Sequence, residues 1–249
     1  MISAILIVKN EAHHLKDCLT SISWADEIIV VDSGSDDGSQ KICKQFNCRL
    51  LETDWPGFGP QKNRALDLAT HDWIFSIDAD ERVSPKLRDE ILKIVESTPE
   101  DGFDIPRNST YCGRFIKHAG WTPDYVLRLF RKDKGRFSND KVHEKVNVQG
   151  SVSKLVNPLT HYSFDTLDQV LDKVNHYSTL GAQQLYAQGK RASLGKAIGK
   201  GIWSFIRTYF LRRGILDGRE GLMLAISNAE GTYYKYAKLA LLSRQKNDH

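Results

Sequence analysis

The architecture of this chain follows from one segment, Trp73-Ile74-Phe75-Ser76-Ile77-Asp78-Ala79-Asp80. A short apolar run bounded by polar residues predicts a buried strand, and open α/β sheets bind ligands just beyond the carboxyl ends of their strands. Because residues i and i+2 of an extended segment point to the same side, Asp78 and Asp80 could share a hard divalent cation. The alternative is an acidic turn whose carboxylates cap a helix that starts at Ser84 and Pro85.

Strand-like and helix-like segments alternate from the first residues to this segment, in the order β, α, β, α, β, α, β. This alternation predicts an α/β fold in which helices cover a largely parallel sheet. Half-buried antiparallel strands are expected next, followed by a helical tail from about Thr166. The expected strands are 4–8, 28–31, 49–51, 73–77, 103–105, 125–130 and 146–148, and the expected helices are 15–22, 39–46, 61–69 and one that begins at 84–85.

The 249 residues have the composition of a soluble globular protein, with 41% apolar and 27% charged residues and a net charge of +4. The positive charge is concentrated between Lys173 and Leu216, where eight lysines and arginines occur without a single Asp or Glu. Aromatic residues are interleaved with these cations. Such a segment suits an anionic partner, which could be a membrane surface, a phosphorylated glycan or a nucleic acid. The alternative is a solvated basic face of a helix.

Four cysteines show no C-x-x-C pair and no histidine at zinc-finger spacing, so neither a structural zinc nor a disulfide framework is expected. The first apolar run is far shorter than a signal-peptide core, and no uncharged apolar stretch approaches about 20 residues. We therefore expect a cytoplasmic protein whose contact with a membrane is peripheral.

Polar residues follow three strands of the predicted sheet: Lys9-Asn10-Glu11 after the first, Asp32 after the second, and Asp78 with Asp80 after the strand at Trp73. Carboxylates at these points can accept hydrogen bonds from a base N–H or from ribose hydroxyls. No G-x-G-x-x-G follows the first strand and no phosphate-binding loop motif occurs, which disfavours dinucleotide and P-loop binding. The pattern therefore favours a nucleotide at this edge of the sheet.

Four motifs follow one another along the chain: Ile5-Leu6-Ile7-Val8-Lys9-Asn10-Glu11, Ile28-Ile29-Val30-Val31-Asp32-Ser33-Gly34-Ser35-Asp36-Asp37-Gly38, Gln61-Lys62-Asn63-Arg64-Ala65 and Asp78-Ala79-Asp80-Glu81. In the order and spacing of these motifs the sequence resembles glycosyltransferase family 2, the inverting nucleotide-sugar enzymes of the GT-A fold. The resemblance covers roughly the first 165 residues, and it departs from the commonest form at Ser33, where many members carry a second aspartate. A further likeness, to bacterial lipopolysaccharide core glucosyltransferases, lies in residues 120–124, 128–131, 142–144 and 213–218.

The resemblance implies a mixed, Rossmann-like GT-A sheet with flanking helices over residues 1–165, followed by a helical extension over residues 166–249. Residues 1–100 would bind the nucleotide sugar and residues 101–165 would face the acceptor, with the domain boundary between Pro158 and Asp165.

The family's chemistry assigns Glu11 and Asp32 to the uridine of a UDP-sugar, and Lys62 or Arg64 to the base or diphosphate. Asp78 would contact the ribose or a metal-bound water. For Lys62 and Arg64, the alternative is a solvated helix face.

The resemblance assigns Asp80 to a Mg²⁺ or Mn²⁺ ion that bridges the diphosphate. Sugar transfer expels a nucleoside diphosphate, and the charge that develops on this leaving group requires a cation. His161 looks like the histidine that some GT-A enzymes bring back to the metal or the diphosphate. Its alternative role is that of a hydrogen-bonded structural residue.

Inversion requires a carboxylate that deprotonates the acceptor hydroxyl on the face opposite the leaving group. Glu144 matches the family position of this base, and Asp140 is a second candidate. An exposed Glu144 paired with Lys141 or Lys145 is the structural alternative.

Three residues are candidates for the acceptor site. Trp121 could stack on a sugar ring, although it could equally pack in a core. Arg128 and Arg131 could meet phosphates of a lipopolysaccharide core, or they could be surface residues of a strand.

The resemblance implies an inverting, metal-dependent hexosyltransferase that moves glucose from UDP-glucose to a heptose or related sugar of a lipid-linked bacterial glycan. The basic tail would hold it at the inner face of the cytoplasmic membrane. One alternative keeps the fold and transfers the sugar to a polyprenyl phosphate or another polysaccharide. Two others are a nucleic-acid-binding protein, which no recognised motif supports, and a catalytically inactive sugar-binding relative.

Overall fold

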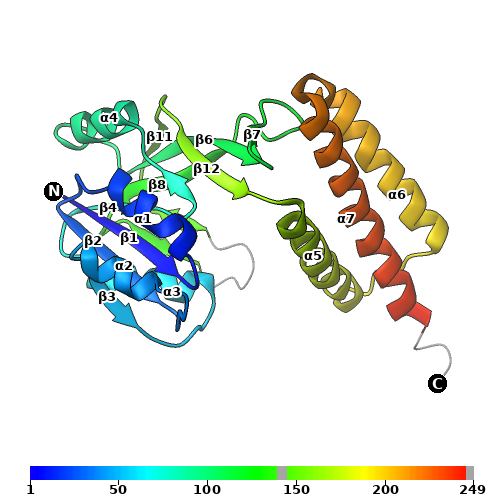
Figure 1. The fold of residues 1–249 in the computed structure, drawn as a ribbon, viewed down its shortest axis with the longest axis horizontal. Helices are drawn as coiled ribbons and strands as arrows, with labels where there is room; N and C mark the ends of the chain where they lie inside the picture. Colours follow the sequence, from blue (N-terminus) through cyan, green and yellow to red (C-terminus); the bar gives the residue numbers. More distant parts are fainter. Residues whose placement is uncertain (139–144, 245–249) are drawn as a thin grey trace. The chain divides into compact units, whose positions relative to one another are not determined.

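The structure is a computed structural model that describes residues 1–138 and 145–244. Figure 1 shows the fold and labels its elements. In chain order these are β1 (Ile2–Val8), α1 (Ala12–Ser21), β2 (Glu27–Asp32), α2 (Ser39–Gln45), β3 (Arg49–Glu52), α3 (Phe58–Leu68), β4 (Trp73–Ser76), β5 (Glu81–Arg82), α4 (Pro85–Val95), β6 (Gly102–Tyr111), β7 (Arg114–Phe115), β8 (Tyr125–Arg131), β9 (Gly135–Phe137), β10 (Val146–Val148), β11 (Val152–Lys154), β12 (Leu159–Phe164), α5 (Leu167–Ala187), α6 (Leu194–Ile206), the π-helical turn η1 (Arg207–Leu211), the 3₁₀ turn η2 (Gly214–Asp217) and α7 (Gly218–Arg244).

The chain forms two compact units, each built from two separate stretches. Unit 1 consists of Met1–Arg107 and Asp124–His161, and unit 2 consists of Asn108–Pro123 and Tyr162–His249. Strands β6 and β12 each continue from one unit into the other, because the divisions fall inside them.

Unit 1 is an α/β layer structure around a mixed sheet, as predicted. Strands β3, β2, β1 and β4 are parallel neighbours in that order, and β8 and β6 continue the sheet in antiparallel pairing. Because β2, β1 and β4 run in parallel, their carboxyl ends meet at one edge.

Alternate residues of β1 face opposite sides of the sheet and enter two different cores. Ile2, Leu6 and Val8 pack with apolar residues of α1 and α4, whereas Ile5 packs with Ala65 and Leu66 of α3. Helices therefore cover both faces of this sheet and leave its carboxyl edge for the loops that follow the strands.

Two local predictions need correction. Helix α3 begins at Phe58 rather than at Gln61, because Pro60 is tolerated in a first helical turn, where its missing N–H is not needed. Strand β6 extends well beyond residue 105, through Pro106 to Tyr111. The segment 158–165, expected as a boundary, contains strand β12, which pairs with β5, and the division between the two units falls inside this segment, after His161.

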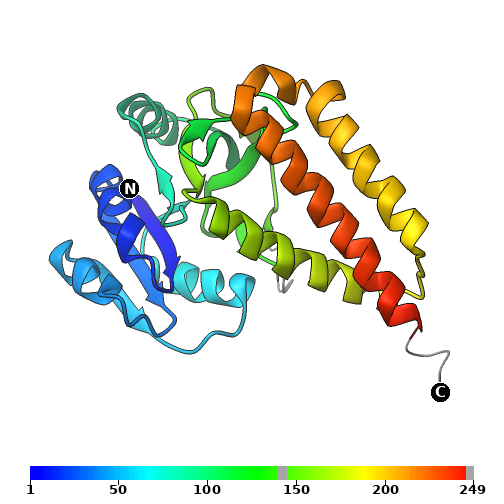
Figure 2. The same cartoon turned by 45° about the vertical axis from the view of Figure 1, so that its right-hand side comes forward.

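Unit 2 is mainly helical. Helix α7 packs against both α5 and α6, and the three helices run side by side in Figure 2, in yellow-green, yellow to orange, and red. Residues of the first stretch of unit 2 join α5 and α7 in one apolar core, which contains Tyr111, Ile116, Ala119, Val170 and Leu224. Among the helices that the structure describes, none has the length and hydrophobicity needed to cross a membrane.

Candidate active site

Asp32 ends β2 and organises the turn that follows it. Its buried carboxylate accepts hydrogen bonds from the N–H groups of Gly34 (3.0 Å) and Ser35 (2.9 Å), from the Ser35 hydroxyl, and from Nε2 of Gln40 (2.9 Å). Burial alone would raise the pKa of Asp32, but these hydrogen bonds hold its pKa below the usual value. Asp32 is therefore an anion that shapes the turn.

The loop after β1 is fixed to this same turn. The Asn10 N–H donates to the Ser35 hydroxyl at 2.9 Å, and the Asp36 N–H donates to Oδ1 of Asn10 at 3.0 Å. The N–H of Glu11 donates to the Ser39 hydroxyl at 3.0 Å. The structure thus places Glu11 beside the turn built by Asp32, at the start of α1.

Asp78, which follows β4, lies between two cations. Its carboxylate pairs with Nζ of Lys62 at 3.1 Å and with the guanidinium of Arg128. Burial opposes the charge of Asp78, but Arg128 and Lys62 hold its pKa well below the usual range. Lys62 is buried, so the interpretation of Lys62 as part of a solvated helix face is wrong.

Arg128 is only 4% exposed and also pairs with Glu81, which is fully buried, at 2.6 Å. Its interpretation as a surface residue is therefore wrong, and this geometry gives no support to an acceptor contact. The two carboxylates raise the pKa of Arg128 despite its burial, so the guanidinium stays charged. Its Nε has no hydrogen-bond partner in the described structure.

Sequence reasoning missed the partners of Glu81. Besides Arg128, its carboxylate meets Arg107 at 3.4 Å and accepts the N–H of Asp78 at 3.0 Å. Arg107 in turn makes two hydrogen bonds to Asp124, of 2.9 and 2.7 Å. The available signal was Arg128 itself, a charge inside the apolar strand β8, because a buried charge requires a partner.

Asp80 faces His161 of β12, with 3.4 Å between Oδ2 of Asp80 and Nε2 of His161. A carboxylate oxygen and an imidazole nitrogen that share one ion at about 2.1 Å each lie roughly 3 Å apart at right-angled coordination. Both side chains are partly exposed, so diphosphate oxygens could complete the ion's coordination. The pair therefore fits a divalent cation. Asp78 has its own partners, so the expected sharing of one ion by Asp78 and Asp80 gains no support.

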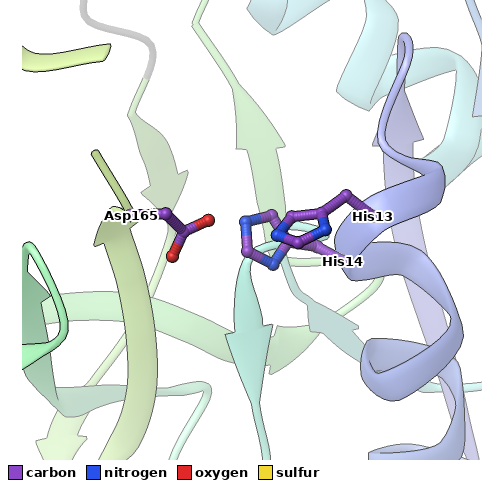
Figure 3. A group of neighbouring side chains, drawn as sticks. All are labelled: His13, His14 and Asp165. Carbon is purple, nitrogen blue, oxygen red and sulfur yellow. The ribbon is translucent and has the colours of Figure 1, made fainter. Parts of the chain in front are cut away.

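Two histidines that the sequence analysis did not single out, His13 and His14, lie in the first turn of α1, close to Glu11 in the chain. The rings of His13 and His14 are neighbours, with 4.5 Å between their centroids and 58° between their planes (Figure 3). Their place after β1 puts two imidazoles beside the carboxyl edge of the sheet, where they add hydrogen-bonding groups to the candidate site.

Two of the remaining candidates, Arg64 and Trp121, lie within the described residues. The Arg64 guanidinium contacts Asp54 (2.8 Å), Gln61 (3.0 Å) and Thr53 (3.1 Å). Trp121 belongs to the aromatic core of unit 2. Glu144 and Asp140, the candidate bases, lie outside the described residues.

Three comparisons with known proteins agree with this architecture. The family profile described as "Glycosyl transferase family 2" matches residues 3–154. The "Lipopolysaccharide core biosynthesis glycosyltransferase LpsC" of Rhizobium meliloti (strain 1021) is 33% identical, over 96% of this chain and 91% of LpsC. The "Uncharacterized glycosyltransferase RP128" of Rickettsia prowazekii (strain Madrid E) is 31% identical, over 97% of this chain and 87% of its own length.

Among solved structures, residues 1–349 of S. aureus TarS in complex with UDP align with a TM-score of 0.50 at 15% identity. The alignment covers 98% of this chain and 91% of the TarS fragment. This likeness confirms the predicted GT-A fold.

Proposed function

Because this chain belongs to glycosyl transferase family 2, we propose that it transfers a hexose from a UDP-sugar to a sugar of a lipopolysaccharide core, with inversion at the transferred carbon. Glucose is the expected hexose and a heptose the expected acceptor. The name of the relative LpsC supports the acceptor class, and the UDP bound to the structural neighbour TarS supports the nucleotide.

One observation carries the proposal: Asp80 and His161 face each other at 3.4 Å, beside the pair formed by Lys62 and Asp78. Asp80 and His161 would hold Mg²⁺ or Mn²⁺, which when bound offsets the charge of the departing diphosphate. Lys62 keeps Asp78 anionic and oriented, so that Asp78 can accept a ribose hydroxyl or a metal-bound water. Asp32 holds the turn next to Glu11, where the uracil would bind.

Glu144 is proposed as the base that removes the proton from the acceptor hydroxyl as this oxygen attacks the sugar. A Glu144→Gln variant should then lose at least about 100-fold in kcat while its affinity for UDP is unchanged. Retained turnover in this variant would instead favour an acceptor that is already an anion, such as a polyprenyl phosphate.

The metal assignment is tested with Asp80→Asn. We expect a loss of at least about 100-fold in kcat/KM, together with loss of the extra thermal stabilisation that Mn²⁺ adds to UDP over EDTA. The control is Asp67→Asn, which removes the same charge from an exposed ion pair with Arg136. Full metal-dependent activity in Asp80→Asn would contradict the assignment.

The helical extension is proposed to rest on an anionic membrane surface. Trp203 of α6 is exposed, as are Phe210 and Leu211 of η1, and they alternate with exposed cations such as Arg207 and Arg212. Apolar side chains can enter the interface while arginines meet lipid phosphates. This surface would place the enzyme at the inner face of the cytoplasmic membrane, where the acceptor is displayed.

Vesicle sedimentation tests this arrangement. Binding to vesicles of phosphatidylglycerol should exceed binding to phosphatidylcholine vesicles and should weaken between 0.1 and 0.5 M salt. Phe210→Ser with Leu211→Ser should reduce it, whereas Leu171→Ser, at another exposed leucine, should not. Equal binding by all variants would refute the role of η1.

A further inference from the structure

Unit 2 contains a cavity of about 350 Å³ that has no role in the proposed reaction. It lies among residues of the first stretch of unit 2 and of helices α5 and α7. Its wall includes Tyr111, Trp121, Phe164, Lys173, Asn228 and Lys235. This volume is in the range of small-molecule sites.

The aromatic wall of this cavity is preformed. The Tyr111 and Trp121 rings meet edge to face with 6.1 Å between centroids, and Trp121 lies 6.3 Å from Phe164. Tyr111 is fully buried and its hydroxyl is bonded to that of Ser227 at 2.9 Å, which fixes its ring. The buried Tyr111 ring thus supports Trp121, whose partly exposed ring can pack against the C–H face of a sugar ring.

The charge of the cavity is positive. Its wall contains two lysines and, among the residues that the structure describes, no acidic side chain. Nζ of Lys173 stands 4.6 Å from the centroid of the Phe164 ring. Neither Lys173 nor Lys235 has a carboxylate partner within residues 1–138 and 145–244, so both ammonium groups can take an anionic group.

Polar groups complete the wall. The carboxamide of Asn228 makes no hydrogen bond within the described part of the chain, and Asn228 lies one helical turn before Thr232 on α7. An amide offers both donors and an acceptor to hydroxyl groups. The cavity thus combines apolar ring faces, an amide and two cations.

We propose that this cavity binds a sugar that carries a phosphate group, with the ring against Trp121 and the phosphate at Lys173 and Lys235. The inference rests on the proposed function, since it assigns the cavity to a phosphorylated sugar of the glycan that accepts the hexose. It adds a second sugar site, within unit 2, to the donor site of unit 1.

Titration calorimetry with glucose 6-phosphate, glucose and inorganic phosphate tests the proposal. We expect glucose 6-phosphate to bind more tightly than either control, and Lys173→Gln to weaken it about tenfold. Lys200→Gln, on the exposed side of α6, is the matched control and should bind normally. Equal affinity of wild type and Lys173→Gln would overturn the proposal.

A steric variant gives a second test that leaves the charges in place. Gly231 lines the cavity, and a Cβ added there would lie 3.8 Å from the nearest atom of Val174, an ordinary contact. Gly231→Leu should therefore fill the cavity and abolish binding of glucose 6-phosphate. Gly199→Leu, whose Cβ would meet open space, should not. Binding that survives in Gly231→Leu would exclude this cavity.

Two further titrations show whether the ligand belongs to the glycan or is a free sugar phosphate, and whether a failure concerns the cavity or the proposed function. A deacylated, phosphorylated lipopolysaccharide core that binds more tightly than glucose 6-phosphate assigns the cavity to the glycan, whereas equal or weaker binding assigns it to a free sugar phosphate. UDP with Mn²⁺ is titrated in parallel. If the wild type binds UDP but no sugar phosphate, only the assignment of the cavity is overturned. If the wild type does not bind UDP, the proposed function is overturned.

Discussion

Arg128 carries a positive charge into the interior of a sheet, where it lies in β8 between β4 and β6. The carboxylates of Asp78 and Glu81 neutralise it, and Arg107 adds a second cation next to Glu81. Removing one member of such a buried cluster leaves an uncompensated charge, which costs far more than the cluster's net contribution to stability.

Glu81→Gln should therefore lower the free energy of unfolding by about 3–5 kcal/mol. The control is Arg136→Gln, which breaks an exposed pair with Asp67 and should cost less than about 1 kcal/mol. Urea unfolding followed by circular dichroism measures both. Equal losses in the two variants would show that Arg128 is not stabilised by Glu81.

The pKa of Asp78 also predicts a pH dependence of stability. Because the folded pKa lies below that of the unfolded chain, about 3.9, unfolding takes up a proton as the pH falls. The contribution of Asp78 is fully present above about pH 5 and is lost as the pH decreases further. The free energy of unfolding should thus fall less steeply between pH 5 and pH 3 in Asp78→Asn than in wild type. Identical slopes would refute the lowered pKa.

The sequence predicted where these carboxylates lie but not what they contact. Asp32 ends β2, and Asp78 and Asp80 follow β4. Because parallel strands bring their carboxyl ends to one edge, the location of these carboxylates follows from local pattern alone. The pairing of Asp78 with Arg128 joins residues far apart in the chain. It depends on the register in which Phe75 faces Leu129, which no local pattern encodes.

Residues 213–218, which resemble a motif of related sequences, form the turn between α6 and α7 and have a structural role there. Asp217 accepts hydrogen bonds from the N–H groups of Lys117 (3.0 Å) and His118 (2.9 Å), and it also contacts Nδ1 of His118. The motif thus anchors the segment that contains Trp121. Its resemblance to other sequences was visible, but its structural role required the fold.

The start of α7 tolerates no side chain at Gly221, because an added Cβ would lie 1.9 Å from the carbonyl oxygen of Gly214. Gly221→Ala should lower the melting temperature by several degrees, since the backbone must shift. In contrast, Gly199→Ala on α6 meets open space and should raise stability by up to about 1 kcal/mol, through the higher helix propensity of alanine. Differential scanning calorimetry compares the two. A neutral Gly221→Ala would contradict the close approach.

Local signals predicted most elements correctly. The Ser84 hydroxyl accepts the N–H of Leu87 at 3.2 Å and Pro85 occupies the first turn of α4, as the helix-start signal indicated. The strands β5, β7, β9 and β11, of two or three residues each, were missed because such short segments give at most a weak periodic signal, and the six-residue β12 was expected only as part of a boundary.

Local sequence patterns could not predict how the whole chain divides into units. In the sequence, residues 108–123 separate the two stretches of unit 1, yet they belong to unit 2. A chain that ends at residue 165 would keep this stretch without its helices and expose Tyr111, Ile116 and Ala119, which are now buried. We expect this truncated chain to bind a hydrophobic dye and to aggregate.

Sedimentation velocity and dye fluorescence measure this outcome. Tyr111→Ser with Ile116→Ser should reduce both dye binding and aggregation of the truncated chain, because they remove the exposed apolar side chains. A monomeric truncated chain that unfolds cooperatively without these substitutions would show that residues 108–123 need no partner.

Because unit 2 consists of two separate stretches of the chain, its parts are synthesised at different times. Ile116 leaves the ribosome about 100 residues before Leu224, its partner in the core, which at ~5–20 residues per second is a delay of roughly 5–20 s. During this interval the nascent chain carries an apolar segment without its cover. Slow translation between β12 and α7 would prolong the exposure of this apolar segment and increase the need for chaperones.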